Sequence, residues 1–257
     1  MTAATVESTA LPHRVVEHDQ WIAERKAFLA REKELTRLQD QLARDRRALP
    51  WERVEKAYVF DTPQGPRTLA DLFDGHGQLM VQHFMLGPGW EAGCPSCSFM
   101  SDHVDGALPH LHQRDLRFVA VSRAPLAEIE RFRQRMGWRF DWVSSFGTDF
   151  NQDYGVSFSP EETARGAVNY NYRMQPGPAE APGISLFRRD GAGNVFHTYS
   201  TYGRGVEAMM GTYVLLDLAP KGRDEDALPY TMAWVRHHDR YDTAAATPAA
   251  ACCRAQH

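Results

Sequence analysis

The sequence contains few cysteines, four in 257 residues. A chain of this length can bury a sizeable core without disulfide or metal staples, so its stability does not depend on the cysteines. An excess of positive charge is also absent, because 29 Lys and Arg residues stand against 33 Asp and Glu residues and the net charge is -4. Nucleic acids and anionic membranes are bound through a concentrated positive field, and we therefore expect neither as a partner.

Long hydrophobic runs are missing as well. No stretch approaches the roughly 20 apolar residues of a membrane-spanning helix, and the start Met1-Thr2-Ala3-Ala4 lacks the charged and apolar regions of a signal peptide. We therefore expect a cytoplasmic protein. In that reducing compartment a close cysteine pair indicates redox chemistry or metal binding rather than a secreted disulfide framework. Hydrophobic residues at 43% and charged residues at 24% are ordinary for a globular protein.

A long amphipathic helix is predicted over residues 17–49. A two-stranded coiled coil would carry apolar residues at the partner positions of its stripe, but Glu24, Arg31 and Asp45 occupy them. The stripe is therefore expected to dock either on the main domain or on a second subunit, which makes a homodimer one possible partner. Its residues recur at every seventh position: Trp21, Phe28, Leu35, Leu42 and Leu49.

The main domain is predicted to be α/β. Strands at 79–86, 117–122 and 140–144 alternate with a helix at 126–136, which implies a mainly parallel sheet flanked by helices. A hairpin follows, with strands at 184–188 and 195–199 around the turn Asp190-Gly191-Ala192-Gly193, and then a closing helix at 206–218. The stretch 151–182 has no clear pattern and is interpreted as an insertion. We assign residues 1–56 to an N-terminal helical extension, 57–235 to the main domain and 236–257 to a disordered tail.

The chemistry is expected at the motif Cys94-Pro95-Ser96-Cys97, which follows an apolar strand and a glycine-rich loop. Two cysteines with this spacing at the start of a helix stand one turn apart, close enough to form a disulfide. Pro95 suits the first helical position, where its missing N–H is not needed. Cys97 shares the helical spacing of apolar residues and is expected to face the core, whereas Cys94 is expected to be exposed. Free N–H groups at the helix start favour a thiolate, so Cys94 is the predicted nucleophile and Cys97 the resolving cysteine.

The sequence resembles the bacterial domain-of-unknown-function family 899. The likeness covers most of the chain, as far as Asp226, and is most specific around the cysteines. The family is thioredoxin-like and is usually described as predicted dithiol-disulfide isomerases or oxidoreductases, which implies both the fold and the class of chemistry for this chain. The segments that carry the likeness are GWEAGCPSCSF at 89–99, VSRAPL at 121–126, MGW at 136–138, WVSS at 142–145 and DFN at 149–151.

The order of elements is similar, more distantly, to that of peroxiredoxins, in which Cys94 would be the peroxidatic cysteine. Peroxiredoxins carry a hydroxyl residue and a proline ahead of that cysteine, but Glu91 and Gly87 occupy those places here. The missing hydroxyl argues against a peroxidase. In thioredoxin-like proteins a cis-proline ahead of a later strand faces the sulfurs, and Pro182, ahead of Ile184, is the candidate; an ordinary turn proline is the alternative.

Other residues near the motif have a functional and a structural interpretation. Trp90 is a candidate for shielding the reactive sulfur or for partner docking, and packing is the alternative. Glu91 is a candidate for proton exchange beside Cys94, and a solvent-facing carboxylate is the alternative. Ser96 completes the motif as a supporting residue.

Metal binding would need two ligands besides the cysteine pair. Cys97 and His110 have the spacing of a zinc finger, but the next histidine, His112, is too close to serve as its fourth ligand. His83, on the predicted strand, is interpreted as a core histidine and His103 as an exposed helix residue.

Two classes of function fit the sequence. The first is a thiol-disulfide oxidoreductase that uses the dithiol without a cofactor and acts on a protein or a low-molecular-weight thiol or disulfide. The second is a non-catalytic thioredoxin-fold protein that binds a partner, senses oxidation or holds a metal. Cys252 and Cys253, in the Ala-rich tail, are interpreted as incidental, with electron transfer to the main dithiol as the alternative.

Overall fold

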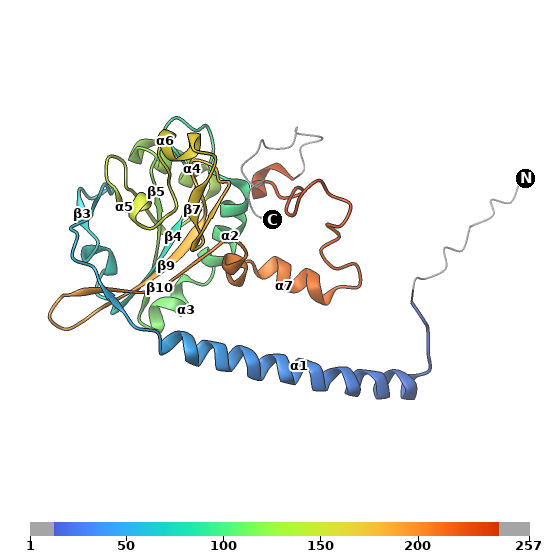
Figure 1. Ribbon diagram of the computed structural model, residues 1–257. Coiled ribbons are helices and arrows are strands. Elements are labelled where there is room, and N and C mark those ends of the chain that lie inside the picture. The colour runs from blue at the N-terminus through green and yellow to red at the C-terminus, as the bar shows by residue number, and fades with distance from the viewer. Residues whose placement is uncertain (1–12, 242–257) are drawn as a thin grey trace, which may run out of the picture. The chain divides into compact units, whose positions relative to one another are not determined.

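The computed structural model describes residues 13–241 (Figure 1). The chain divides into two compact units, residues 1–49 and 50–257. The first unit contains one helix of 30 residues, α1 (His18–Arg47), where the seven-residue series predicts it. No residue of α1 is buried within its own unit, and its charged side chains pair along the helix, as Arg25 does with Glu32 at 2.8 Å.

The second unit is built on a six-stranded sheet in the order β1-β10-β9-β4-β5-β6. Strands β4, β5 and β6 are parallel to one another, whereas β9 is antiparallel to β4 and β10 is antiparallel to β9. The predicted α/β class, with a thioredoxin-like, helix-flanked central sheet and an N-terminal helix, is confirmed. The strands are β1 (Glu52–Arg53), β4 (Gln78–His83), β5 (Leu116–Ser122), β6 (Asp141–Ser144), β9 (Gly183–Arg189) and β10 (Val195–Tyr202).

The central strands are buried on both faces because successive side chains point to opposite sides of the sheet. On β5, Phe118 and Ala120 belong to the hydrophobic cluster that contains both motif cysteines, whereas Val119 and Val121 belong to the cluster on the other face. This burial on two faces explains the continuous apolar run in the sequence. It also places the cysteines on one defined side of the sheet.

The helices follow the local sequence signals where those signals are strong. Helix α4 has the predicted bounds and ends at Gly137, whose φ of 69° is a left-handed conformation that glycine adopts without strain. The predicted helix at 206–218 is two elements: a 3₁₀ helix that ends at Met209 and an α-helix that begins at Gly211. The remaining helices are α2 (Pro95–Asp105), α3 (Leu108–Gln113), α4 (Leu126–Met136), α5 (Phe150–Asp153), α6 (Pro160–Ala164), α7 (Gly211–Leu218) and the 3₁₀ helices η1 (Asp71–Phe73), η2 (Gly203–Met209) and η3 (His238–Arg240).

The stretch 151–182, which has no clear pattern in the sequence, contains α5, α6 and a two-stranded sheet of β7 (Val168–Tyr170) and β8 (Arg173–Gln175). These elements pack around a third hydrophobic cluster that includes Tyr170 and Tyr202. A further two-stranded sheet pairs β2 (Val59–Phe60) with β3 (Arg67–Thr68). None of the described helices is both long and apolar enough to cross a membrane.

Two predicted domain boundaries differ from the structure. Strand β1 pairs with β10, so the main domain includes Glu52 and does not begin at residue 57. At the other end, residues 236–241 are not a disordered tail, because they pack on the domain and His237 is buried. Both segments are too short or too irregular to show a period in the sequence. The rest of the predicted tail, including Cys252 and Cys253, lies outside the described residues.

Candidate redox site

Cys94 and Cys97 stand at the start of α2, directly after the loop that follows β4. Cys94 is the N-cap residue, Pro95 occupies the first turn, and both cysteines are free thiols. The backbone holds the helix start in place: the Cys94 N–H donates to the Met85 carbonyl at 3.0 Å, and the Cys94 carbonyl accepts from the Ser98 N–H at 3.0 Å. The predicted helix start is therefore the structural setting of the motif.

The two sulfur-bearing residues are both buried. Cys97 is 0% exposed, as its position on the core face predicts, but Cys94 is only 3% exposed, so the prediction that Cys94 is open to solvent is wrong. Both residues belong to one hydrophobic cluster with Phe84 and Phe132. The difference arises outside the motif, because the apolar and aromatic residues of this cluster come from several parts of the chain, including Val235 near its C-terminal end.

Gly93, directly before Cys94, is required by the packing around the loop. A Cβ atom at this position would lie 2.5 Å from Phe84 and 2.8 Å from Phe132, both closer than side-chain contacts allow. The aromatic rings therefore pack directly against the backbone at the residue before Cys94. This close approach fixes the path by which Cys94 enters α2.

Gln82 ties the motif helix to the central strand. Its side-chain amide donates to the Cys97 carbonyl at 3.1 Å and accepts from the Ser101 hydroxyl at 2.9 Å. All three residues are buried, and a buried polar side chain is stable only when it is hydrogen-bonded. The pair of bonds fixes the position of α2 on β4 at the level of Cys97.

Tyr170 approaches the site from β7, within the stretch that the sequence left unassigned. Its hydroxyl donates to the Pro182 carbonyl at 2.7 Å and accepts from the Gly203 N–H at 2.8 Å. Burial raises the pKa of Tyr170, the Gly203 N–H lowers it, and the charge of a nearby Cys97 thiolate raises it further. The expected neighbour, Pro182, is buried behind Tyr170, but it is not a cis-proline because no peptide bond within residues 13–241 is cis.

A C-terminal segment closes the other side of Cys94. His237 is buried, and its Nε2 donates to the carbonyl of Gly93 at 2.8 Å. Val235 is 3% exposed and belongs to the same cluster as both cysteines. The apolar and aromatic residues Tyr230, Met232, Trp234 and Val235 are the sequence signal that could have marked this segment as packed.

The other predicted residues lie at the edge of the site. Trp90 is 37% exposed on the loop, where its indole packs over Gly87. Glu91 is exposed, and Ser96 is half-buried in the first turn of α2. Among the described residues, no three His, Cys, Asp or Glu side chains are grouped so that they could hold a metal ion.

Two histidines have structural partners. His103 is not a simple exposed residue, since it contacts the Phe99 carbonyl at 2.6 Å and the Thr212 hydroxyl at 2.7 Å. His83 is a core histidine: its Nε2 lies 2.8 Å from the Ser185 hydroxyl, and burial lowers its pKa to about 3. Its Nδ1 has no partner among the described atoms.

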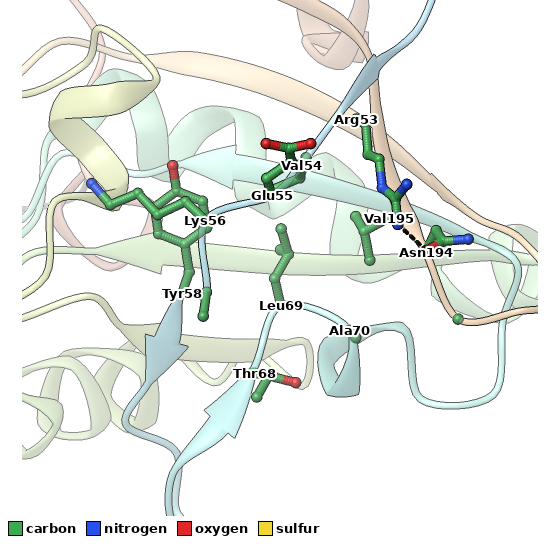
Figure 2. Close-up of a pocket in the computed structure, with 12 residues that line it drawn as sticks. Arg53, Val54, Glu55, Lys56, Tyr58, Thr68, Leu69, Ala70, Asn194 and Val195 are labelled. Carbon is green, nitrogen blue, oxygen red and sulfur yellow. Dashed lines mark hydrogen bonds between the residues drawn. The ribbon is translucent and has the colours of Figure 1, made fainter.

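A separate hollow of about 550 Å³ lies beside β2 and β3. Figure 2 shows its lining, including Arg53, whose guanidinium donates to Asn194 at 2.6 Å. Lys56, the other cation, pairs with Asp149 at 2.9 Å and Asp153 at 2.6 Å. The residues that line the hollow belong neither to the cysteine motif nor to the hydrophobic cluster around the cysteines. Its two cations, Arg53 and Lys56, already have partners. This hollow therefore adds nothing to the redox site.

The model of a family described as "Bacterial protein of unknown function (DUF899)" matches residues 10–241. No curated protein matches the sequence.

Similar solved structures include peroxidoxin BcpB from Mycobacterium tuberculosis, with 15% identity, a TM-score of 0.41 and coverage of 64% of this chain and 97% of that one. The bacterioferritin comigratory protein of Xanthomonas campestris has 12% identity and a TM-score of 0.39, with coverage of 60% and 88%. The mitochondrial 2-cys peroxiredoxin of Plasmodium falciparum has 12% identity and a TM-score of 0.38, with coverage of 65% and 95%.

Proposed function

The chain belongs to the bacterial family of unknown function DUF899, and we propose that it exchanges disulfides through the dithiol of Cys94 and Cys97. The partner is a protein or a low-molecular-weight thiol or disulfide. The observation that carries the proposal is the position of Cys94 as the N-cap of α2 with Cys97 one turn further on. A helix N-terminus has free N–H groups and a positive dipole end, and both favour the thiolate that performs the exchange.

The exchange proceeds in two displacements. The Cys94 thiolate attacks one sulfur of the partner disulfide, the partner S–S bond breaks, and one partner thiol leaves with a proton. The Cys97 thiolate then attacks Sγ of Cys94 in the mixed disulfide and releases the second partner thiol. The partner gains two electrons and two protons, while Cys94 and Cys97 form a disulfide. The reverse sequence oxidises a partner dithiol.

The surroundings of Cys97 support its role as the resolving thiol. Cys97 is 0% exposed and lies inside the first turn of α2, whereas Cys94 stands at its N-cap, so opening of the helix start exposes Cys94 first. Gln82 holds the Cys97 carbonyl and keeps its turn of α2 close to Cys94. A resolving thiol that is fixed one turn from the mixed disulfide acts at a high effective concentration, which makes the second displacement fast.

A second candidate function is redox sensing without turnover. The burial of both thiols favours it, because a buried pair exchanges slowly with protein partners. In this case Cys94 and Cys97 would form a disulfide under oxidation, and a change in conformation would carry the signal. The two functions differ in whether a partner disulfide is reduced in a catalytic cycle.

A redox titration tests the proposal. The reduced protein is equilibrated with glutathione buffers, and free thiols are counted in denaturant at each potential. We expect a reversible two-electron transition that is absent in Cys94→Ser and in Cys97→Ser, together with turnover of a small disulfide substrate. A transition without turnover supports sensing instead, and a dithiol that stays reduced in fully oxidised glutathione overturns both.

A further inference from the structure

The chain that follows α7 returns to the start of α2 without forming a long helix (Figure 1). Within residues 219–241 its one regular element is the three-residue η3. We call residues 232–241 the C-terminal cover. Although irregular, it contains a buried valine and a buried histidine, Val235 and His237, and both lie against the site.

Apolar contacts seat the cover over the dithiol helix. Val235 enters the cluster of Cys94 and Cys97. The ring of Trp234 packs edge-on against Phe99 of α2, with centroids 5.7 Å apart. Val235 and Trp234 thereby pack in the same region of the domain as α2, whose N-cap residue Cys94 is 3% exposed.

Polar contacts hold the cover at its outer end. Besides the bond from His237 to Gly93, Arg135 of α4 forms two hydrogen bonds of 2.8 Å with Asp239. His238 Nδ1 lies 2.7 Å from Oδ1 of Asp102 on α2. These contacts join the cover to two different helices, but the ion pair of Arg135 and Asp239 is partly exposed and contributes little free energy.

The other end of the cover is anchored on one carboxylate. Oε1 of Glu225 accepts from the Trp234 indole at 2.6 Å, the Met232 N–H at 3.0 Å and the Tyr213 hydroxyl at 2.7 Å. Three donors converge on this one carboxylate oxygen, and each of these hydrogen bonds is charge-assisted. The cover is thus attached to Glu225 at its first residues and to Gly93 and Arg135 at its outer end. We call the outer contacts, made by His237 and Asp239, the latch.

We infer that the C-terminal cover is a displaceable lid, and that Cys94 reacts only when its outer end leaves Gly93 and Arg135. An irregular segment whose outer end is held by a few hydrogen bonds can open locally at a lower free energy than the domain unfolds. The inference deepens the proposed function by stating how a partner gains access to the nucleophile. The lid itself does not depend on that function, because burial of Cys94 limits any reagent that attacks its sulfur.

The test measures the alkylation rate of Cys94 by iodoacetamide in the full chain. Cys97→Ser, Cys252→Ser and Cys253→Ser leave Cys94 as the single cysteine. On this background, His237→Ala with Asp239→Asn removes both contacts of the latch. Glu130→Gln is the matched control, because Glu130 also forms a two-bond pair with an arginine of α4 but does not touch the cover. We expect about a tenfold faster alkylation for the latch variant and an unchanged rate for the control; tenfold corresponds to about 1.4 kcal/mol.

An unchanged rate in a folded latch variant would overturn the lid, as would an equal increase in the Glu130→Gln control. Hydrogen exchange of the unmodified protein gives a second measurement that needs no variant. The amides of residues 232–241 should exchange by a local opening, before those of α4; exchange only with global unfolding would also overturn the lid. If the latch variant is alkylated faster but no disulfide is ever exchanged, the lid stands and the proposed function falls.

Discussion

His237 Nε2 lies 2.8 Å from the carbonyl oxygen of Gly93, the residue directly before Cys94. The two residues are 144 positions apart in the sequence, so this bond joins the C-terminal cover to the backbone that leads into the nucleophile. On its other side, the Nδ1 of the same ring accepts from Arg135 at 3.3 Å. Since one ring nitrogen donates and the other accepts, the bound form of His237 is neutral.

This arrangement predicts how stability depends on pH. Burial lowers the pKa of His237, the Gly93 carbonyl raises it, Arg135 and Arg240 lower it, and Asp239 raises it, with a net decrease. The unfolded chain then binds the proton more readily, with a pKa of about 6.5. The contribution of His237 is therefore complete above that value and is lost as the pH falls through it toward the lower folded value.

Urea unfolding at pH 7.5 and 5.5 measures the effect. The free energy of unfolding should fall on acidification in the native sequence and fall less in His237→Gln, which stays neutral. His83, His112 and His197 also have lowered pKa values and act in the same direction in both proteins, so the difference isolates His237. If the free energy of unfolding fell equally in the native sequence and in His237→Gln, the result would contradict a neutral His237 ring.

The roles of the two cysteines predict a trapping experiment. In Cys97→Ser the second displacement is blocked, so the mixed disulfide with the partner should accumulate on Cys94. Capture from an extract followed by reduction and mass spectrometry identifies the partner. Cys94→Ser is the control and should trap nothing. Equal trapping by both variants, or trapping only by Cys94→Ser, would reverse or remove the assigned roles.

Gly93→Ala should destabilise the domain and disturb the site together. Its Cβ would meet Phe84 and Phe132 at 2.5 and 2.8 Å, and relief of such overpacking typically costs about 1–3 kcal/mol. Gly191→Ala is the matched control, because a Cβ there meets no atom within 4 Å. Urea unfolding measures the free energy of unfolding of both variants. Equal values for Gly93→Ala and Gly191→Ala would contradict the crowding at Gly93.

Tyr170→Phe should lower stability by about 1–3 kcal/mol, because it leaves the Pro182 carbonyl and the Gly203 N–H without their partner in a buried place. Tyr172→Phe, at a tyrosine that is 76% exposed, is the control and should change stability less. Chemical denaturation measures both. An effect equal to that of the control would mean that water reaches the two backbone groups.

The apolar stripe of α1 predicts a homodimer. Trp21 and Leu35 are 53% and 55% exposed, and such a stripe is covered either by the main domain or by a second copy; we propose the second copy. Leu35→Glu with Leu42→Glu should convert a dimer to a monomer in sedimentation, while Lys33→Glu, outside the stripe, should not. A monomeric native chain at micromolar concentration would refute the dimer.

Much of the fold follows from the sequence because its signals are local. The bounds of α4 follow from periodicity and a terminal glycine, and the hairpin of β9 and β10 from turn chemistry at 190–193. The place of Cys97 on the core face also follows, since helical spacing alone decides it. These features need only residues that are close together in the chain.

The accessibility of Cys94 is different, because only the tertiary structure decides it. The motif places Cys94 at a helix start, but Val235 joins its hydrophobic cluster and His237 bonds to the Gly93 carbonyl from more than a hundred positions away. Irregular segments leave no repeating pattern, and their position depends on which surface offers the best packing and hydrogen bonds. The sequence by itself determined the cysteine pair and its helix; the fold determined that Cys94 is buried.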